Sequence, residues 1–309
     1  MSMTMTPMTD SALPERSLWS RLTNNRDVLG FLFMLPAAVF LLCFLTYPLG
    51  LGVWLGFTDT TIGRDGVFVG LENYGFLWSD QVFWLSVFNT ILYTTVASVA
   101  KFALGLWLAL LLNQHLPFKS FFRAIVLLPW VVPTVLSALA FWWIYDSQFS
   151  IVSWSLIKMG LIDTPINFLG DPNTARASVI AANVWRGIPF VAISLLAGLQ
   201  TIPASLQEAA SLDGATSWQR FRYVTLPLLS STVRLSVFFA IIGSLQLFDL
   251  VMPLTGGGPS NSTQTMVTFL YTYGVTRMQV GLGSAVGVVL FVICVTLAFG
   301  YKRIFMRHD

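Results

Sequence analysis

The stretch Glu208-Ala-Ala-Ser-Leu-Asp-Gly-Ala215 places two carboxylates beside small residues, in a polar interval between two long apolar runs. Carboxylates at an exposed corner can form charge-assisted hydrogen bonds to another protein, and small residues allow that protein to approach closely. The same carboxylates can instead pair with Arg220 and Arg222 on a solvated loop. The sequence of this interval is therefore consistent with two interpretations, a contact surface for another protein or a solvated loop with internal ion pairs.

A second group of polar residues lies inside an apolar run. Asn183, Gly187 and Phe190 fall at i, i+4 and i+7, so they share one face of a helix. An amide and an aromatic ring provide hydrogen bonds and a stacking surface for a polar ligand. Small residues on such a face can also simply let helices pack closely. Another apolar run carries a comparable face formed by Ala240, Ser244 and Leu247.

Two basic residues also lie within apolar runs. Arg186 stands about midway along its run, where an unpaired charge costs a few kcal/mol or more. It is either a structural residue, paired with another subunit or a group of carbonyls, or a direct contact for an anionic ligand. Lys101 is interpreted as a residue whose long stem reaches the interface or lines a subunit contact.

Residues for bond chemistry are missing from the sequence. It contains no Gly-x-x-x-x-Gly-Lys-Ser/Thr loop for nucleotide phosphates, and His115 and His308 stand alone, which argues against a metal site. No nucleophile and base stand out as a set, so a membrane enzyme is the weakest alternative. A secondary transporter would carry intramembrane carboxylates, and here only Asp249 lies near the end of a run.

The amino-acid composition indicates the environment of the polar residues described above. Of 309 residues, 55% are hydrophobic and 10% are charged, and the mean hydropathy is +0.73. Soluble domains carry roughly 25% charged residues, so the chain is an all-α integral membrane protein. Six runs are long enough to span a bilayer, at about 29–51, 83–112, 124–145, 177–199, 235–254 and 280–301. The segment 149–161 is too short to cross and is predicted to be an interfacial helix.

The basic residues set the orientation. Six spans place both termini on one side, and most lysines and arginines fall there: Arg16, Arg21, Arg26, Lys119, Arg123, Arg220, Arg222, Arg234, Lys302, Arg303 and Arg307. Only Arg64, Lys158, Arg176 and Arg277 fall opposite. Because cytoplasmic segments are enriched in Lys and Arg, both termini and the Glu208 stretch are predicted to be cytoplasmic. The net charge of +3 gives no reason to expect nucleic acid as a partner.

Turn-forming residues predict the shape of this cytoplasmic stretch. Pro203 favours a first helical turn, Gly214 permits a helix to stop, and Ser217 can cap a second helix. Pro227 is predicted to end that second helix. The result is a helix, a bend and a helix.

Glu208, Ala209, Ala210, Gly214 and Leu226-Pro227 have the spacing of the EAA loop, and the sequence resembles the permease subunits of binding-protein-dependent ATP-binding-cassette importers. Val224 stands where the family pattern has isoleucine. Asn183-Val-Trp185 with Pro189-Phe190, and Leu254-Thr-Gly-Gly-Gly-Pro259, look like the carbohydrate and glycerol-derivative branch (maltose-type permeases). The resemblance covers about residues 29–303.

The resemblance implies a type I importer permease in the bacterial inner membrane that moves a sugar, an oligosaccharide, or a sugar or glycerol derivative by alternating access. The ligand in the second interpretation of Arg186 would then be an anionic sugar derivative. It implies a second permease as heterodimer partner, two ATPase subunits and a periplasmic binding protein. ATP and Mg would be bound by the ATPase subunits, and no cofactor by this chain. The residues that contact the ATPase would be Glu208, Ala209, Ala210, Asp213, Gly214, Leu226 and Pro227.

The expected organisation is a cytoplasmic tail at 1–28, a permease domain at 29–303 with a coupling loop at 200–230, and a tail at 304–309. The substrate path is expected at Asn183, Arg186, Gly187, Phe190, Ala240, Ser244 and Leu247. The outer gate or binding-protein contact is expected at Asp249, Gly256, Gly257, Gly258 and Pro259, since glycines permit sharp bends there.

Overall fold

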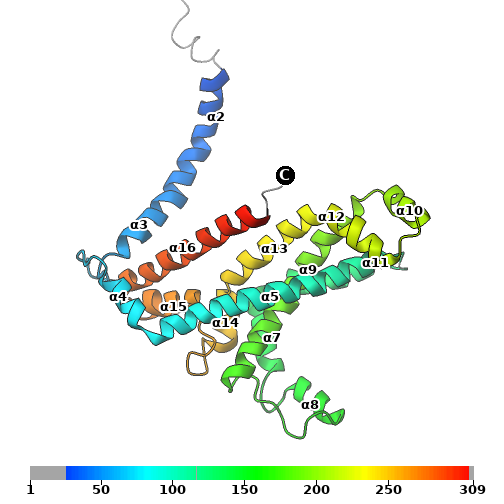
Figure 1. The fold of residues 1–309 in the computed structure, drawn as a ribbon. Coiled ribbons are helices and arrows are strands. Elements are labelled where there is room, and N and C mark those ends of the chain that lie inside the picture. The colour runs from blue at the N-terminus through cyan, green and yellow to red at the C-terminus, as the bar shows by residue number, and fades with distance from the viewer. Residues whose placement is uncertain (1–25, 116, 306–309) are drawn as a thin grey trace, which may run out of the picture. The chain divides into compact units, whose positions relative to one another are not determined.

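A computed structural model describes residues 26–115 and 117–305, and these residues are almost entirely helical (Figure 1). The predicted tail at 1–28 lies mostly outside the described residues, as do residues 306–309 of the predicted C-terminal tail. The chain divides into two units, 1–52 and 53–309. Four single helices are long and apolar enough to cross a membrane, and two bent helix pairs raise the number of candidate spans to six.

The first candidate span is continuous from Arg26 to Leu55 and confirms the predicted run at 29–51. It consists of α2 (Arg26–Leu41), the π-helical turn η1 (Leu42–Thr46) and α3 (Tyr47–Leu55). Pro48 has no N–H for the helical ladder, and the wider turn immediately before it accommodates the proline without ending the helix. None of the residues in α2 or α3 is buried.

The second unit begins its helical core with α4 (Glu72–Ser79) and α5 (Gln81–Asn113). The Asp80 side chain accepts hydrogen bonds from the backbone nitrogens of Val82 (2.6 Å) and Phe83 (2.9 Å), which fixes the start of α5. The predicted run at 83–112 is confirmed as a single long helix. Short helix α4 was not predicted from the sequence.

The third predicted run, 124–145, is not one straight helix. α6 (Lys119–Val131) and α7 (Thr134–Ile144) meet at 91°. Val132 is extended (ψ 131°), because Pro133 disfavours the helical conformation of the residue before it and cannot donate to the ladder. The predicted helix at 149–161 is present as the shorter α8 (Ile151–Lys158).

The fourth predicted run, 177–199, lies within α9 (Pro172–Gln200), which begins at an Asp171 cap with proline in its first turn. The fifth, 235–254, is wrong as a single helix. α13 (Ser230–Leu245) ends, Gln246 leaves the helical region (ψ 40°), and α14 (Phe248–Thr255) begins anew. The sixth run is α16 (Val280–Phe305), preceded by α15 (Met266–Tyr271) and the π-helical turn η3 (Thr272–Thr276).

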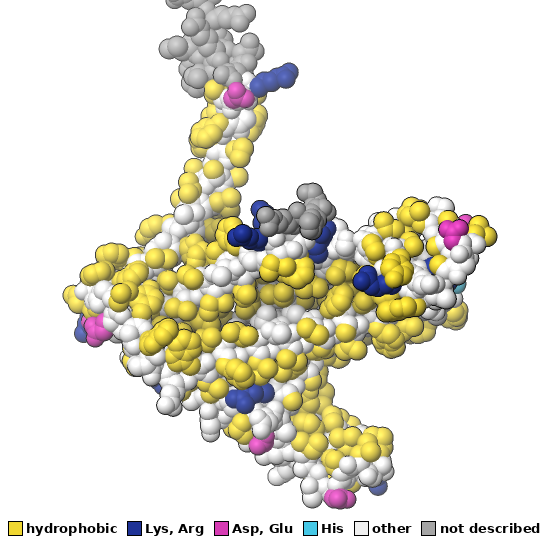
Figure 2. Space-filling view, viewed as in Figure 1, with side chains coloured by type: hydrophobic (Ala, Val, Ile, Leu, Met, Phe, Trp, Pro, Cys, Tyr) yellow, Lys and Arg dark blue, Asp and Glu magenta, His cyan; other side chains and the backbone are white. Residues whose placement is uncertain are grey.

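Three hydrophobic clusters hold the second unit together, and each includes residues of α5 or α9. One joins α5 and α9 to α7 and α14, the next joins them to α13, and the last joins α5 to α4, α15 and α16. Outside these clusters large apolar side chains are exposed, and hydrophobic atoms cover much of the visible face in Figure 2. An apolar outer surface is what a lipid-facing protein requires.

Candidate functional site

The Glu208 segment (residues 200–230) has the helix, bend and helix expected from its sequence. α10 (Ala204–Leu212) ends at Gly214, whose φ of +81° favours glycine. Gly214 N–H donates to Ser211 O (3.1 Å) and Ala215 N–H to Ala210 O (3.0 Å), the two bonds of a Schellman cap. The corner is therefore fixed by backbone hydrogen bonds that depend on a left-handed residue.

Two details of the predicted second helix are wrong. The residue that caps α11 (Ser217–Arg220) is Thr216, which forms a capping box with Gln219, and not Ser217. Pro227 does not end the helix, because the π-helical turn η2 (Phe221–Thr225) widens the backbone ahead of it and α12 (Leu226–Leu228) continues. The direction changes by 71° only before α13.

The two carboxylates of the Glu208 segment are exposed and have no basic partner in the described chain. Neither Glu208 nor Asp213 lies within 4.0 Å of a lysine or arginine nitrogen there. Arg220 instead donates to Ser211 Oγ (2.8 Å) and Ser217 Oγ (3.3 Å), which ties α11 to the end of α10. The structure thus lacks the internal ion pairs of the solvated-loop interpretation.

Large apolar side chains are exposed on the same segment. Leu212 is 89% exposed, Trp218 69% and Tyr223 73%. Ala209 and Gly214 are exposed beside them, while Ala210 and Leu226 are half-buried. Exposed carboxylates that form no ion pair with a described residue, next to exposed apolar side chains, are typical of a protein contact surface.

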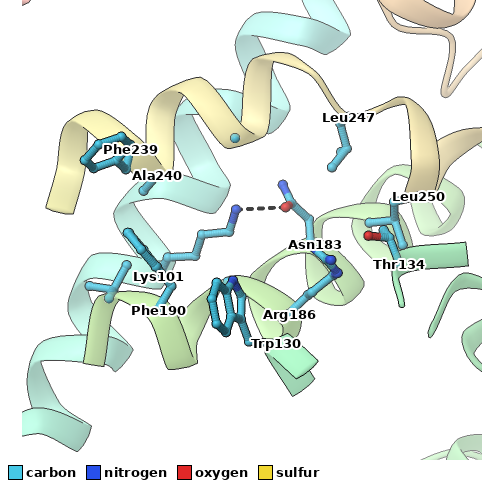
Figure 3. A pocket seen from close by; sticks show the side chains of 13 residues that line it. Lys101, Trp130, Thr134, Asn183, Arg186, Phe190, Phe239, Ala240, Leu247 and Leu250 are labelled. Carbon is cyan, nitrogen blue, oxygen red and sulfur yellow. Dashed lines mark hydrogen bonds between the residues drawn. The ribbon is translucent and has the colours of Figure 1, made fainter. Parts of the chain in front are cut away.

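A separate cavity of about 150 Å³ lies where α5, α9 and α13 meet the break between α6 and α7. We call it the Lys101 cavity. Its lining includes six of the seven residues predicted for the substrate path: Asn183, Arg186, Gly187, Phe190, Ala240 and Leu247. The seventh, Ser244, is buried and hydrogen-bonded to the lining. Lys101, Trp130, Thr134 and Phe239 also line it (Figure 3).

Lys101 is the residue whose surroundings differ most from the sequence interpretation. A stem that extends toward the end of its helix is wrong, because Lys101 is 5% exposed and its Nζ donates to Asn183 Oδ1 (2.8 Å) and Ser244 Oγ (2.9 Å). A contact with a second subunit stays a prediction. Figure 3 shows its side chain pointing from α5 toward Asn183 of α9. A signal was present, since Lys101 lies deep in its run, roughly 16 Å from the nearer end at 1.5 Å per residue. That distance exceeds the reach of a lysine side chain.

Gly187 makes room for this lysine. A Cβ at position 187 would collide with Cε of Lys101 and lie 2.6 Å from its Cδ. The lysine stem therefore rests on the bare backbone of α9, four residues after the asparagine that accepts its hydrogen bond. Asn183 and Gly187 share a helix face, as predicted, and both contact the same side chain.

Arg186 is half-buried and its Nε is buried without a hydrogen-bond partner in the described chain. No carboxylate of a described residue comes within 4.0 Å of it. The charge of Asp249, in the first turn of α14, acts on Arg186 from a greater distance. The described part of the chain thus provides no ion pair for this guanidinium.

Three aromatic rings form one wall of the Lys101 cavity. Phe190 lies 6.3 Å from Trp130 and 6.0 Å from Phe239, centroid to centroid, and is nearly perpendicular to Phe239 (81°). Trp130 and Phe239 are about half exposed and Phe190 is half-buried, so the two outer rings have the most free surface. They come from runs far from Phe190 in sequence, and spacing along the chain could not find them.

The loop after α14 contains the other predicted site. Gly256 (φ +60°) and Gly257 (φ +89°) are left-handed, Gly258 and Pro259 follow, and Thr263 Oγ1 donates to Gly258 O (2.7 Å). Asn89 of α5 and Arg176 of α9 both donate to Ser262 O, each at 2.9 Å. The loop is therefore fastened to two long helices and is not an independent turn.

Residues 101–308 match the model of the family described as binding-protein-dependent transport system inner membrane component. The trehalose/maltose transport system permease protein MalF of Thermococcus litoralis is 35% identical over 291 residues, covering 94% of this chain and 98% of that protein. The sulfoquinovosyl glycerol transport system permease protein SmoG of Agrobacterium fabrum is 34% identical over 308 residues, covering 99% of each.

Solved structures include chains with a similar fold. A bacterial alginate ABC transporter chain, solved with a periplasmic protein bound to alginate pentasaccharide, superposes with a TM-score of 0.79 at 23% identity, covering 93% of this chain and 96% of that one. This likeness confirms the predicted all-helical permease architecture. With the family model matching two thirds of the chain, and two relatives aligned over nearly all of it, the chain belongs to the family of binding-protein-dependent transport system inner membrane components.

Proposed function

We propose that this permease imports a sugar or sugar derivative, which enters the Lys101 cavity and leaves on the opposite side of the membrane by alternating access. The observation that carries the proposal is the cavity itself, which combines amide and hydroxyl groups with a wall of aromatic rings. Relatives that align with most of the chain are named for trehalose/maltose, sulfoquinovosyl glycerol and lactose transport. These names support a carbohydrate as the transported class.

Each part of the cavity has a role in this proposal. Asn183 presents an amide for sugar hydroxyls, and Trp130, Phe190 and Phe239 offer rings on which a sugar can stack. At about 150 Å³ the cavity is smaller than the roughly 300 Å³ at which sites for drug-sized ligands begin. A site completed by a second, similar permease accounts for this size, and we therefore assign the chain to a heterodimer.

The Glu208 segment is proposed as the contact for an ATPase subunit. It has two exposed carboxylates without ion pairs to any described residue and the exposed side chains of Leu212 and Trp218, while the sequence has no P-loop of its own. Two ATPase subunits, one on each permease, would bind ATP and Mg. Their closure would move the segment, and the fixed corner at Gly214 would transmit that movement to α13.

The excess of basic residues supports placing the Glu208 segment and both termini in the cytoplasm. The loop at 256–259 then lies on the outer side, where a periplasmic binding protein would deliver the sugar. Its attachment to α5 and α9 through Asn89 and Arg176 would couple that contact to the cavity helices.

Reconstitution tests the proposal. The chain is placed in proteoliposomes with its second permease and ATPase subunits, and labelled trehalose, maltose, lactose and acidic sugars are supplied with the binding protein. We expect uptake of at least one sugar that requires both ATP and the binding protein. Uptake that continues without ATPase subunits would indicate a secondary transporter, and a covalently altered sugar would indicate an enzyme. Either result would overturn the proposal.

A further inference from the structure

We propose that Lys101 and Arg186 together receive an oxyanion, so that the imported molecule is a sugar derivative with a carboxylate, sulfonate or phosphate group. The inference rests on the proposed function and names the class of substrate for the same cavity. Lys101 becomes a residue that determines specificity, although the sequence interpretation gave it no part in transport.

The hydrogen bonds of Lys101 leave a donor available. Asn183 Oδ1 can only accept, and the Ser244 hydroxyl uses its one hydrogen on Ala240 O (2.8 Å), so Ser244 Oγ also accepts from Nζ. An ammonium has three hydrogens, and these two neutral oxygens take two of them. The third hydrogen remains for a group inside the cavity that Lys101 lines.

Arg186 adds a second cation to the same cavity. Its Nε is buried without a hydrogen-bond partner in the described chain. In Figure 3 the side chain of Asn183 lies between those of Lys101 and Arg186. Asn183 thus separates the two positive charges and accepts a hydrogen bond from one of them.

The cavity does not neutralise these charges. None of the described residues that line it is an aspartate or glutamate, and neither cation has a carboxylate within 4.0 Å in the described chain. Asp249 acts on Arg186 only from farther away. Burying a cation without a counter-ion is costly, and two like charges in one small space repel each other. An anion that enters the cavity lined by both cations offsets both costs, whereas a neutral sugar offsets neither.

The remaining lining suits the rest of such a molecule. The rings of Trp130, Phe190 and Phe239 form a wall that can pack against a sugar ring, and a charge elsewhere on that sugar can face Lys101 and Arg186. A free inorganic anion would make no use of the aromatic wall. The geometry therefore favours a sugar that carries the anionic group over the anion alone.

The first test is a matched screen of the complete assembly, comprising both permeases, both ATPase subunits and the binding protein. Sugar-stimulated ATP hydrolysis and uptake are measured with methyl glucoside, methyl glucuronide and methyl 6-deoxy-6-sulfoglucoside, and with neutral and acidic disaccharides. Stimulation by anionic members is expected. Transport of neutral members alone would overturn the inference and leave the proposed function intact. No ATP-dependent uptake of any sugar would overturn both.

The second test changes the cations and uses the anionic sugar that gives the fastest uptake. Lys101→Met should lower the uptake of that sugar roughly tenfold to hundredfold, as expected for one hydrogen bond to a charged group, while Lys101→Arg retains most of it. Lys302→Met removes an exposed lysine of α16 and should leave uptake unchanged. Uptake of the anionic sugar at the normal rate by Lys101→Met would overturn the inference.

Arg186→Gln covers the case in which Lys101→Met fails to assemble. Assembly is followed by co-purification with the ATPase subunits and by basal ATP hydrolysis. In an assembled Arg186→Gln variant, the preference for the anionic sugar over its neutral analogue should fall about tenfold. An unchanged preference would contradict the assignment of Arg186 to the anion.

Discussion

The polar side chains of the Glu208 segment and of the Lys101 cavity differ in exposure and in hydrogen bonding. In the segment, Glu208 and Asp213 are exposed and have no ion pair in the described chain. In the cavity, Lys101 and Asn183 are buried and bonded to each other. In the proposed function, the exposed groups of the segment contact an ATPase subunit, whereas the hydrogen-bonded groups of the cavity contact the sugar. Energy coupling and substrate choice would then depend on different parts of one chain.

The largest effect is expected from breaking the corner of the Glu208 segment. Gly214→Pro replaces a φ of +81° with one near −65° and removes the N–H that donates to Ser211 O. Sugar-dependent ATP hydrolysis should be lost, or the ATPase subunits should no longer co-purify. Full activity in both measurements would rule out the coupling role.

Gly160→Pro is the matched control for that variant. Gly160 (φ +70°) ends α8 with the same pair of bonds, Gly160 N–H to Ile157 O and Leu161 N–H to Leu156 O. The control damages an equal cap outside the Glu208 segment. It should leave the ATPase subunits bound.

A smaller but still large effect is expected at the loop after α14. Replacing Gly256, Gly257 and Gly258 together with valine forces side chains onto two left-handed residues, and a Cβ at Gly257 would collide with Oε1 of Gln264. Uptake that depends on the binding protein should fall by more than tenfold. Gly63→Val is the control, since Gly63 is also left-handed (φ +85°) but has open space around it. Normal uptake by the triple variant would remove this loop from the delivery step.

Within the cavity, Gly187→Ala should lower uptake about tenfold. The new methyl group would push Lys101 away from Asn183, although alanine is a better helix former than glycine. Gly243→Ala is the matched control, because Gly243 also lines the cavity on a helix and has no atom within 4 Å of a built Cβ. If the two variants transport equally well, the position of Lys101 does not matter for transport.

The smallest effect is expected from trimming the apolar surface of the Glu208 segment. Leu212→Ala removes a side chain that is 89% exposed, so stability should not change, but ATPase binding should weaken a few-fold if that side chain is covered in the assembly. Leu161→Ala, which trims a 66% exposed leucine at the end of α8, is the control. Titration of detached ATPase subunits onto each variant measures the difference.

The same contrast explains what could be predicted from the sequence. The Glu208 segment is contiguous, and its corner depends on local residues such as Gly214, so its pattern was sufficient to predict the helix, bend and helix. It did not predict the Thr216 cap or the continuation of the helix past Pro227. The break before α7 also has a local cause in Pro133. The break between α13 and α14 has neither proline nor glycine at Gln246 or Leu247, and only packing in the folded chain reveals it.

The cavity could be predicted only in part. Asn183, Gly187 and Phe190 share a helix face that periodicity finds. Lys101 is 82 positions from Asn183 and 143 from Ser244, so their contact depends on how α5, α9 and α13 pack. The position of Lys101 far from both ends of its apolar run indicates that the ammonium needs hydrogen-bond acceptors, but it does not identify them.

The most direct test of this division is the number of ATP molecules hydrolysed per sugar imported, measured in the same proteoliposomes for two variants. Glu208→Ala should raise that ratio, because hydrolysis continues without effective transport. Asn183→Leu should lower uptake and sugar-stimulated hydrolysis together and leave the ratio unchanged. The opposite pattern, an unchanged ratio for Glu208→Ala and a raised one for Asn183→Leu, would contradict the separation of coupling from substrate choice.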